Sequence, residues 1–217
     1  MHIVLGLLVA VAGVTATPPV AIEQEPLHHL LFENAVVKVL DVQVPAGATM
    51  AMHTHPNDHL AILLRGAKLR NEVQGEQPVD RFIGAPGTVI YLPAGPPHRQ
   101  ISLDDQTARW IAVELIGAAK PGRTEPVGPH YEDVLDNARV QVARLKLAPG
   151  ERVDRFPFSA PYLQVAITPG EVEVASQHAG NARVSLPGGS AVWEDHRIQS
   201  LVNRGDHPLE LVFLRIK

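Results

Sequence analysis

The sequence repeats itself at an offset of 103 residues, and this repeat constrains the fold more than any other feature. Residues 33–39 (ENAVVKV) resemble residues 136–142 (DNARVQV), and each copy runs on to a glycine, Gly47 or Gly150, that ends a turn containing proline and alanine. Coincidence among valine-rich strands is the alternative, but matched starts and matched ends at one offset favour a duplication. We therefore expect two similar units in tandem.

Both units have the apolar pattern of strands rather than helices. The valines at the start of each copy are two residues apart, as in a half-buried strand, and no long segment shows an apolar period of 3.6 residues. Short apolar runs such as 60–64 and 209–214 indicate strands that are buried on both faces. An all-β fold follows, and the two-sided run at 60–64 indicates packing of one unit on another, within the chain or between chains.

Composition excludes several classes of function. With 19 Lys and Arg against 23 Asp and Glu, the formal net charge is -4, so no basic excess is present to hold a phosphate backbone and no nucleic-acid partner is expected. Cysteine is absent, which removes disulfides, thiolate metal sites and cysteine nucleophiles. Histidine occurs 11 times and clusters, so metal chemistry in this chain must use imidazole and carboxylate.

The first residues are typical of an export signal. Residues 3–16 carry no charge, are too few to span a bilayer, which takes about 20, and end in small residues before Pro18-Pro19. We expect residues 1–16 to be a signal peptide cleaved near Ala16, which would make the mature chain periplasmic or secreted, with no membrane contact. Because no basic residue precedes the run, a misplaced start codon or an apolar first strand are the alternatives.

The residues that carry chemistry gather in one segment, 53–59, with the sequence HTHPNDH. On a strand, residues two apart point to the same face, so His53 and His55 aim into one volume, and His59 joins them if the chain resumes there as a strand. Imidazoles grouped in this way can replace the water around a divalent ion. The alternatives are an exposed histidine-rich loop or histidines satisfied within a core.

Glycines and a fourth histidine stand at fixed distances from this segment. The pattern resembles the two cupin motifs, G-x5-H-x-H-x3,4-E-x6-G and G-x5-P-x-G-x2-H-x3-N, over about residues 33–116. The matching positions are Gly47, His53, His55, His59 and Gly66 in the first motif, and Gly87, Pro93, Gly95 and His98 in the second. There are two departures, because His59 replaces the usual glutamate and Ser102 replaces the usual asparagine.

The resemblance implies double-stranded β-helix barrels of the cupin or jelly-roll type in two tandem repeats. We expect an amino-terminal barrel over 27–118, a linker over 119–131 and a second barrel over 132–217. The resemblance also implies that one divalent transition metal is held by His53, His55, His59 and His98. Four imidazoles suit Fe, Mn, Ni, Cu or Zn and disfavour Ca and Mg, which prefer oxygen ligands. Of these ions Fe or Mn is the preferred prediction, and Ni, Cu and Zn are the alternatives.

The second unit keeps the spacing and loses the ligands. Phe156, Phe158 and Tyr162 stand where the first unit has its three clustered histidines, and Gln199 corresponds to His98. Aromatic side chains at inward positions indicate a packed core rather than a ligand pocket. We therefore predict a degenerate second barrel and one metal per chain.

Several functions are compatible with such a site. The preferred prediction is a dioxygenase-like, metal-dependent oxidoreductase acting on a small organic molecule. The alternatives are a non-catalytic metal- or small-ligand-binding protein and an isomerase or lyase that uses the metal as a Lewis acid. Glu114 and Tyr91 are candidate acid–base groups, although a structural role is the favoured interpretation for both. Arg65 and Arg70 are candidates for contact with an anionic substrate, and the alternative is that both are solvated surface residues. A homodimer stays an open alternative.

Overall fold

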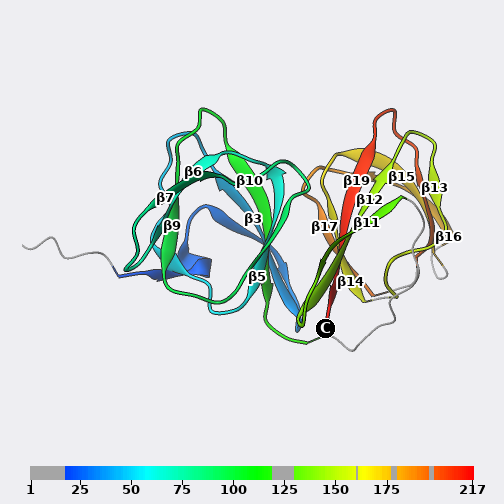
Figure 1. Cartoon of the computed structure of the whole chain (residues 1–217). Coiled ribbons are helices and arrows are strands. Elements are labelled where there is room, and N and C mark those ends of the chain that lie inside the picture. The colour runs from blue at the N-terminus through cyan, green and yellow to red at the C-terminus, as the bar shows by residue number, and fades with distance from the viewer. Residues whose placement is uncertain (1–17, 119–129, 160, 177–179, 196–197) are drawn as a thin grey trace, which may run out of the picture.

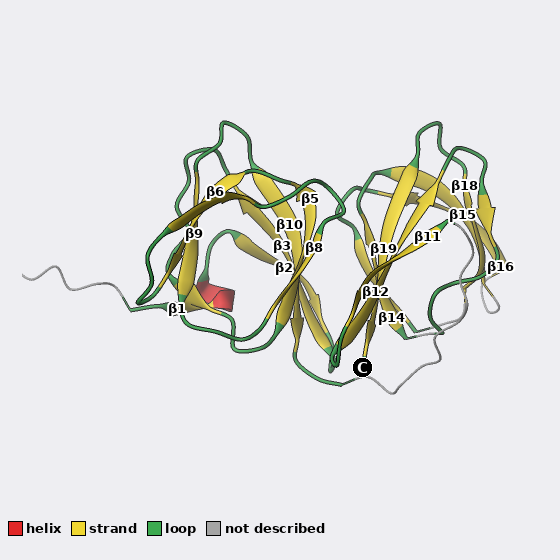
Figure 2. Cartoon of the chain, in the orientation of Figure 1, coloured by secondary structure: helices red, strands yellow, loops and turns green. Residues whose placement is uncertain are grey.

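The computed structural model describes residues 18–118, 130–159, 161–176, 180–195 and 198–217. These residues form strands and one short 3-10 helix, η1 (Ile22–Gln24), and fold into two barrels that lie side by side (Figures 1 and 2). The expected all-β fold with two tandem barrels is therefore confirmed. The expected signal peptide and most of the expected linker lie outside the described residues. Within the described part of the chain, no helix has the length and apolar character needed to cross a membrane.

The first barrel is built from two five-stranded sheets. Its strands are β1 (Val20–Ala21), β2 (His28–Glu33), β3 (Val37–Val44), β4 (His53–Thr54), β5 (His59–Arg65), β6 (Lys68–Val73), β7 (Val79–Phe82), β8 (Val89–Leu92), β9 (His98–Ser102) and β10 (Ala108–Leu115). One sheet has the order β1-β4-β9-β6-β7 and the other the order β2-β3-β10-β5-β8. All strand pairs are antiparallel except β1 with β4.

The second barrel repeats this plan. Its strands are β11 (Tyr131–Asp136), β12 (Val140–Leu147), β13 (Arg152–Val153), β14 (Tyr162–Ala166), β15 (Gly170–Ser176), β16 (Gly180–Leu186), β17 (Ala191–Glu194), β18 (Ile198–Asn203) and β19 (Leu209–Ile216). The orders β11-β12-β19-β14-β17 and β13-β18-β15-β16 match those of the first barrel strand for strand, apart from β1. The duplication expected from the sequence is thus present in the topology.

The repeated Asn-Ala pair has the same local role in both barrels. Asn34 Oδ1 accepts hydrogen bonds from the backbone N–H groups of Val36 and Val37 at 2.8 and 2.9 Å. Asn137 Oδ1 accepts from those of Arg139 and Val140 at the same distances. Asparagine side chains stabilise turns by bonding the backbone just ahead of them, so the repeat marks the turn that starts β3 and β12.

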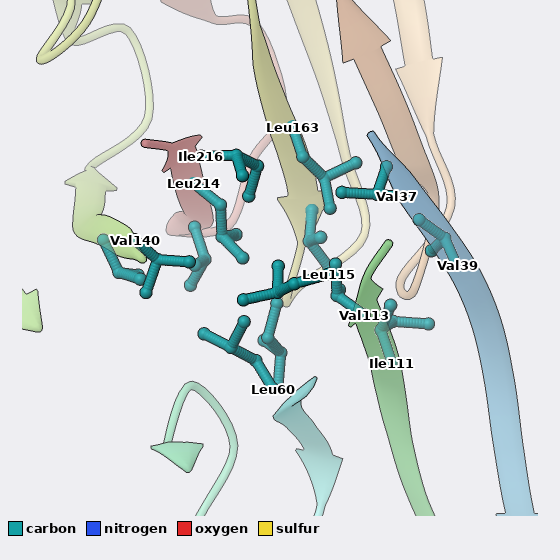
Figure 3. Packing of buried hydrophobic residues seen from close by; sticks show 14 of the residues in the cluster. Val37, Val39, Leu60, Ile111, Val113, Leu115, Val140, Leu163, Leu214 and Ile216 are labelled. Carbon is teal, nitrogen blue, oxygen red and sulfur yellow. The ribbon is translucent and has the colours of Figure 1, made fainter. Parts of the chain in front are cut away.

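The two barrels share one hydrophobic core (Figure 3). It is formed by the outer faces of the sheets β2-β3-β10-β5-β8 and β11-β12-β19-β14-β17. Strand β5 shows why the run 60–64 is apolar on both faces. Leu60 and Ile62 belong to the shared core, while Ala61 and Leu63 face the interior of the first barrel. The packing of one unit on another indicated by this strand therefore occurs within the chain.

Two features position the histidine-bearing segments. Gly66, after β5, has no room for a side chain, because an added Cβ would lie 1.6 Å from the backbone oxygen of Gly84. The segment before residue 27 also belongs to the first barrel, since β1 pairs with β4 and Ile22 of η1 is only 1% exposed in the core. The barrel that holds the histidines thus begins earlier than the expected residue 27.

Candidate metal centre

The four histidines predicted as ligands come together inside the first barrel. His53 starts β4, His55 directly follows it, His59 starts β5, and His98 starts β9 beside His53. The ring centroids of His53 and His98 are 4.8 Å apart, and those of His55 and His59 are 3.9 Å apart. His55 also lies 5.1 Å from His53 and 5.2 Å from His98. Four residues that span 46 positions in the sequence therefore face one small volume.

A fifth imidazole, that of His28 on β2, joins the cluster. Its ring centroid is 4.8 Å from that of His53 and 5.7 Å from that of His55, and the residue is 8% exposed. Its Nδ1 lies 2.8 Å from a carboxylate oxygen of Glu25, which is itself buried. Burial raises the pKa of Glu25, but hydrogen bonds from His28 and two backbone N–H groups outweigh this effect and hold the pKa below its usual value. Glu25 is therefore ionised at neutral pH and accepts a hydrogen bond from the Nδ1–H group of His28.

Sequence reasoning missed His28 because it precedes both motifs. The adjacent His29 is exposed, so the pair His28-His29 gives no sign of which residue points inward. The inward direction of His28 follows only from the pairing of β2 with β3 in the structure, where His28 lies opposite the fully buried Val42.

Every histidine in the cluster turns its Nδ1 towards an oxygen acceptor. His53 Nδ1 is 2.9 Å from the backbone oxygen of Ala51, and His55 Nδ1 is 2.5 Å from Glu114 Oε1. His59 and His98 face the backbone oxygens two residues before them at 3.4 and 3.5 Å. Carbonyl and carboxylate oxygens only accept, so each Nδ1 carries the proton and each Nε2 presents a lone pair.

This arrangement fits a metal ion. Histidines that bind metals usually donate their other N–H group to a carboxylate or a backbone carbonyl. His53 Nε2 is buried and has no partner among the described residues, although unpaired buried polar atoms are costly. Ligand atoms of His28, His53 and His55 also lie within 4.8 Å of one another. The cluster can therefore hold a metal ion on its Nε2 atoms.

Burial keeps the imidazoles in the neutral form that a metal requires. It lowers the pKa of His53 and of His55 to about 3 and that of His59 to about 4. The same cause lowers the pKa of His98. Ligand histidines must be deprotonated to bind, so at neutral pH the cluster is ready for an ion without releasing protons.

Glu114, on β10, supports the cluster from behind. Its side chain is 1% exposed and bonds His55 on the Nδ1 side, with Asn57 Nδ2 3.4 Å from its second oxygen. Burial raises the pKa of Glu114, while His59 and Asn57 oppose the rise. His55, His59 and Glu114 form a second group with ligand atoms within 4.8 Å. Because Glu114 meets the protonated nitrogen of His55, it orients that ring rather than sharing an ion with it.

The other polar residues considered from the sequence lie away from the cluster or are engaged elsewhere. Tyr91 donates its hydroxyl hydrogen to Asp58, which also accepts from the backbone N–H of Ala94. Arg70 forms a two-bond ion pair with Asp80. Arg65 is exposed at the end of β5 and lines neither of the cavities described below.

Comparison with known proteins identifies the fold. Residues 40–114, which contain the four predicted ligands, match the family model of the Cupin domain. Solved structures of cupin proteins resemble the chain over both barrels. The first barrel therefore contains a match to the cupin domain, and the chain as a whole has the cupin fold. A search of curated proteins by sequence found no match.

Three solved structures illustrate the likeness in fold. AerE from Microcystis aeruginosa is 12% identical, with a TM-score of 0.60 over 89% of this chain and 98% of AerE. YhaK from Escherichia coli is 17% identical, with a TM-score of 0.57 over 86% and 87% of the two chains. Salicylate 1,2-dioxygenase from Pseudaminobacter salicylatoxidans is 12% identical, with a TM-score of 0.57 over 86% and 75%. At these identities the likeness shows the fold alone.

Two adjoining cavities of about 60 and 150 Å³ lie over the clustered histidines. Both are lined by His55, His59 and His98, and both also by Asn71, Arg81, Leu92 and Gln100. The smaller cavity has an apolar wall that includes Leu69, Ile83, Ile90 and Trp110. A cavity of about 150 Å³ can hold a molecule the size of benzene, so the site has room for a small organic ligand.

The second barrel is filled where the first has its histidines. Phe156, Phe158 and Tyr162 are 7%, 3% and 2% exposed and belong to the core of that barrel. Phe156 and Tyr162 pack on Phe213, with ring centroids 6.0 and 5.7 Å apart. Gln199, the counterpart of His98, is exposed on β18.

Proposed function

We propose that this protein is a metal-dependent cupin oxidoreductase of the dioxygenase type, acting on a small organic molecule. The observation that carries the proposal is the common orientation of the clustered imidazoles. Each gives its Nδ1 proton to an oxygen acceptor, so the Nε2 atoms of His53, His55, His59 and His98 are left for one ion. We further propose that the ion is Fe or Mn, with one per chain.

The metal would supply Lewis acidity and a one-electron redox couple while four neutral ligands leave its double charge in place. The chain's own residues would fix and shield that ion. Glu114 and the backbone oxygens hold the imidazole rings in place. The apolar wall of the smaller cavity limits water beside the cluster.

A binding protein without catalysis is the second candidate, and one observation favours it. Within the described residues, neither cavity over the cluster is lined by a carboxylate or a tyrosine hydroxyl. Glu114 and Tyr91, the acid–base candidates of the sequence, are both engaged in hydrogen bonds. The described lining of these cavities therefore offers no carboxyl or phenol group as a proton donor for catalysis.

Oxygen consumption separates these candidates. We would load the metal-free protein with Fe or Mn and measure oxygen uptake with a panel of diketones, phenols and thiols. Turnover that depends on the metal and on one class of compound supports the oxidoreductase. No uptake across the panel, with the metal bound in a one-to-one ratio, contradicts it and favours the binding protein. Activity of the Zn- or Ni-loaded protein without oxygen would identify an isomerase or lyase instead.

A further inference from the structure

One arginine faces the cavity over the histidines. Arg81, on β7, lines both the smaller and the larger cavity. Across the ranges that the structure describes, its guanidinium makes no hydrogen bond and no ion pair. A cation that lines a ligand site without a counter-ion from the chain is suited to an anionic ligand.

Arg81 is exposed, and the strand register places its side chain on the cavity side of the sheet. Arg81 lies opposite Leu69 on β6, which is 1% exposed and belongs to the interior core of the first barrel. Side chains alternate along a strand, so the next pair, Arg70 and Asp80, points outward and forms its ion pair on the surface. β7 is an edge strand of the sheet that lies away from the second barrel (Figure 1).

The surroundings of Arg81 indicate the kind of molecule that fits. Gln100 Nε2 donates to Asn71 Oδ1 at 3.1 Å, which leaves the amide N–H groups of Asn71 for a ligand. Leu69, Ile83 and Trp110 form an apolar wall beside these polar groups. No acidic side chain lines either cavity in the described part of the chain, and Arg81 is the only lysine or arginine in their lining.

We propose that Arg81 is the anion-binding residue of this site and that its substrate is a small monocarboxylate with an apolar body. This inference rests on the proposed function in that it concerns the same cavity. A guanidinium matches a carboxylate through two parallel hydrogen bonds. The lining offers one such guanidinium, which matches one carboxylate group. The apolar wall contacts the body of the molecule, and the amide of Asn71 supports the carboxylate.

Calorimetry with matched probes tests this inference. Benzoate and its neutral analogue benzamide would be titrated into the full chain, both metal-free and loaded with redox-silent zinc. The variants are Arg81→Gln, which removes the charge, and Arg81→Lys, which keeps it without the planar fork. Arg70→Gln, on the neighbouring strand but facing outward, is the matched control. Because Arg81 makes no bond within the described chain, its variants should keep the thermal stability of the wild type.

We expect the wild type to bind benzoate about tenfold more tightly than benzamide. Arg81→Gln should lose about tenfold in benzoate affinity and leave benzamide within about twofold, with Arg81→Lys in between. Arg70→Gln should match the wild type. Unchanged benzoate affinity in Arg81→Gln, equal affinity of the wild type for the two probes, or no benzoate binding at millimolar concentrations would each overturn the inference.

Elemental analysis of the same samples separates this inference from the proposed function. The inference alone is contradicted if the wild type and Arg81→Gln both bind one zinc per chain and have the same affinity for benzoate. The proposed function alone is contradicted if the wild type takes up no metal but loses benzoate affinity in Arg81→Gln.

Discussion

Replacing Glu114 with glutamine is expected to weaken metal binding about tenfold, and replacing it with alanine about a hundredfold. The carboxylate lies 2.5 Å from His55 Nδ1, and both side chains are almost fully buried. A hydrogen bond to a charged acceptor contributes about 1.5–3 kcal/mol, and each 1.4 kcal/mol corresponds to about a factor of ten in affinity. Glutamine keeps the volume and can still accept through its carbonyl oxygen, so its effect should lie at the lower end.

The assay is a zinc titration followed by calorimetry on metal-free protein, with circular dichroism to show that each variant is folded. Glu72→Gln is the matched control, because Glu72 pairs with Arg99 rather than with any histidine of the cluster. Its zinc affinity should equal that of the wild type. A folded Glu114→Gln variant that binds zinc as tightly as the wild type would refute the reasoning that Glu114 positions His55.

Three further predictions concern stability and processing. The three histidines whose pKa values burial lowers to about 3 or 4 bind protons in the unfolded chain below about pH 6.5 but not in the folded one. The free energy of unfolding of the metal-free protein should therefore fall with pH, by about 1.4 kcal/mol per histidine and about 4 kcal/mol in all at pH 5.5; urea unfolding that is equal at pH 7.5 and 5.5 would contradict this. Gly66→Ala forces a Cβ to 1.6 Å from a backbone oxygen and should lower the free energy of unfolding by about 3 kcal/mol or more. In the control Gly95→Ala the nearest atom is 3.7 Å away and the loss should be far smaller, so equal melting temperatures of the two variants would contradict the prediction. Mass spectrometry of exported protein should find a terminus near Ala16, and an intact Met1 in a soluble cytosolic product would exclude the signal peptide.

The sequence was sufficient for the fold because its signals are local and repeated. Asn34 and Asn137 sit at the same turn, and the strands that follow them alternate in the same way. The run 60–64 also showed that one barrel face packs on another. It could not show which partner covers that face, because a shared core within the chain and an interface between chains need the same apolar side chains.

The candidate site was predictable only as far as the motif spacing reaches. His53, His55, His59 and His98 occupy motif positions, and the structure brings their rings together. His28 enters from β2, a strand outside both motifs, and its inward direction depends on pairing with β3. The role of Arg81 likewise follows from the register of β6 with β7. Long-range pairing of this kind leaves no spacing signature in the sequence.

The most direct test of the account is metal binding by His98→Ala. His98 lies 45 residues beyond His53 in the sequence, so its participation requires the barrel to close around one ion. The matched control is His29→Ala, which removes an exposed histidine next to the cluster. The account predicts one zinc per chain for the wild type and for His29→Ala, and at least a tenfold loss of affinity for His98→Ala. A His98→Ala variant that binds one zinc with wild-type affinity would contradict the four-histidine metal centre.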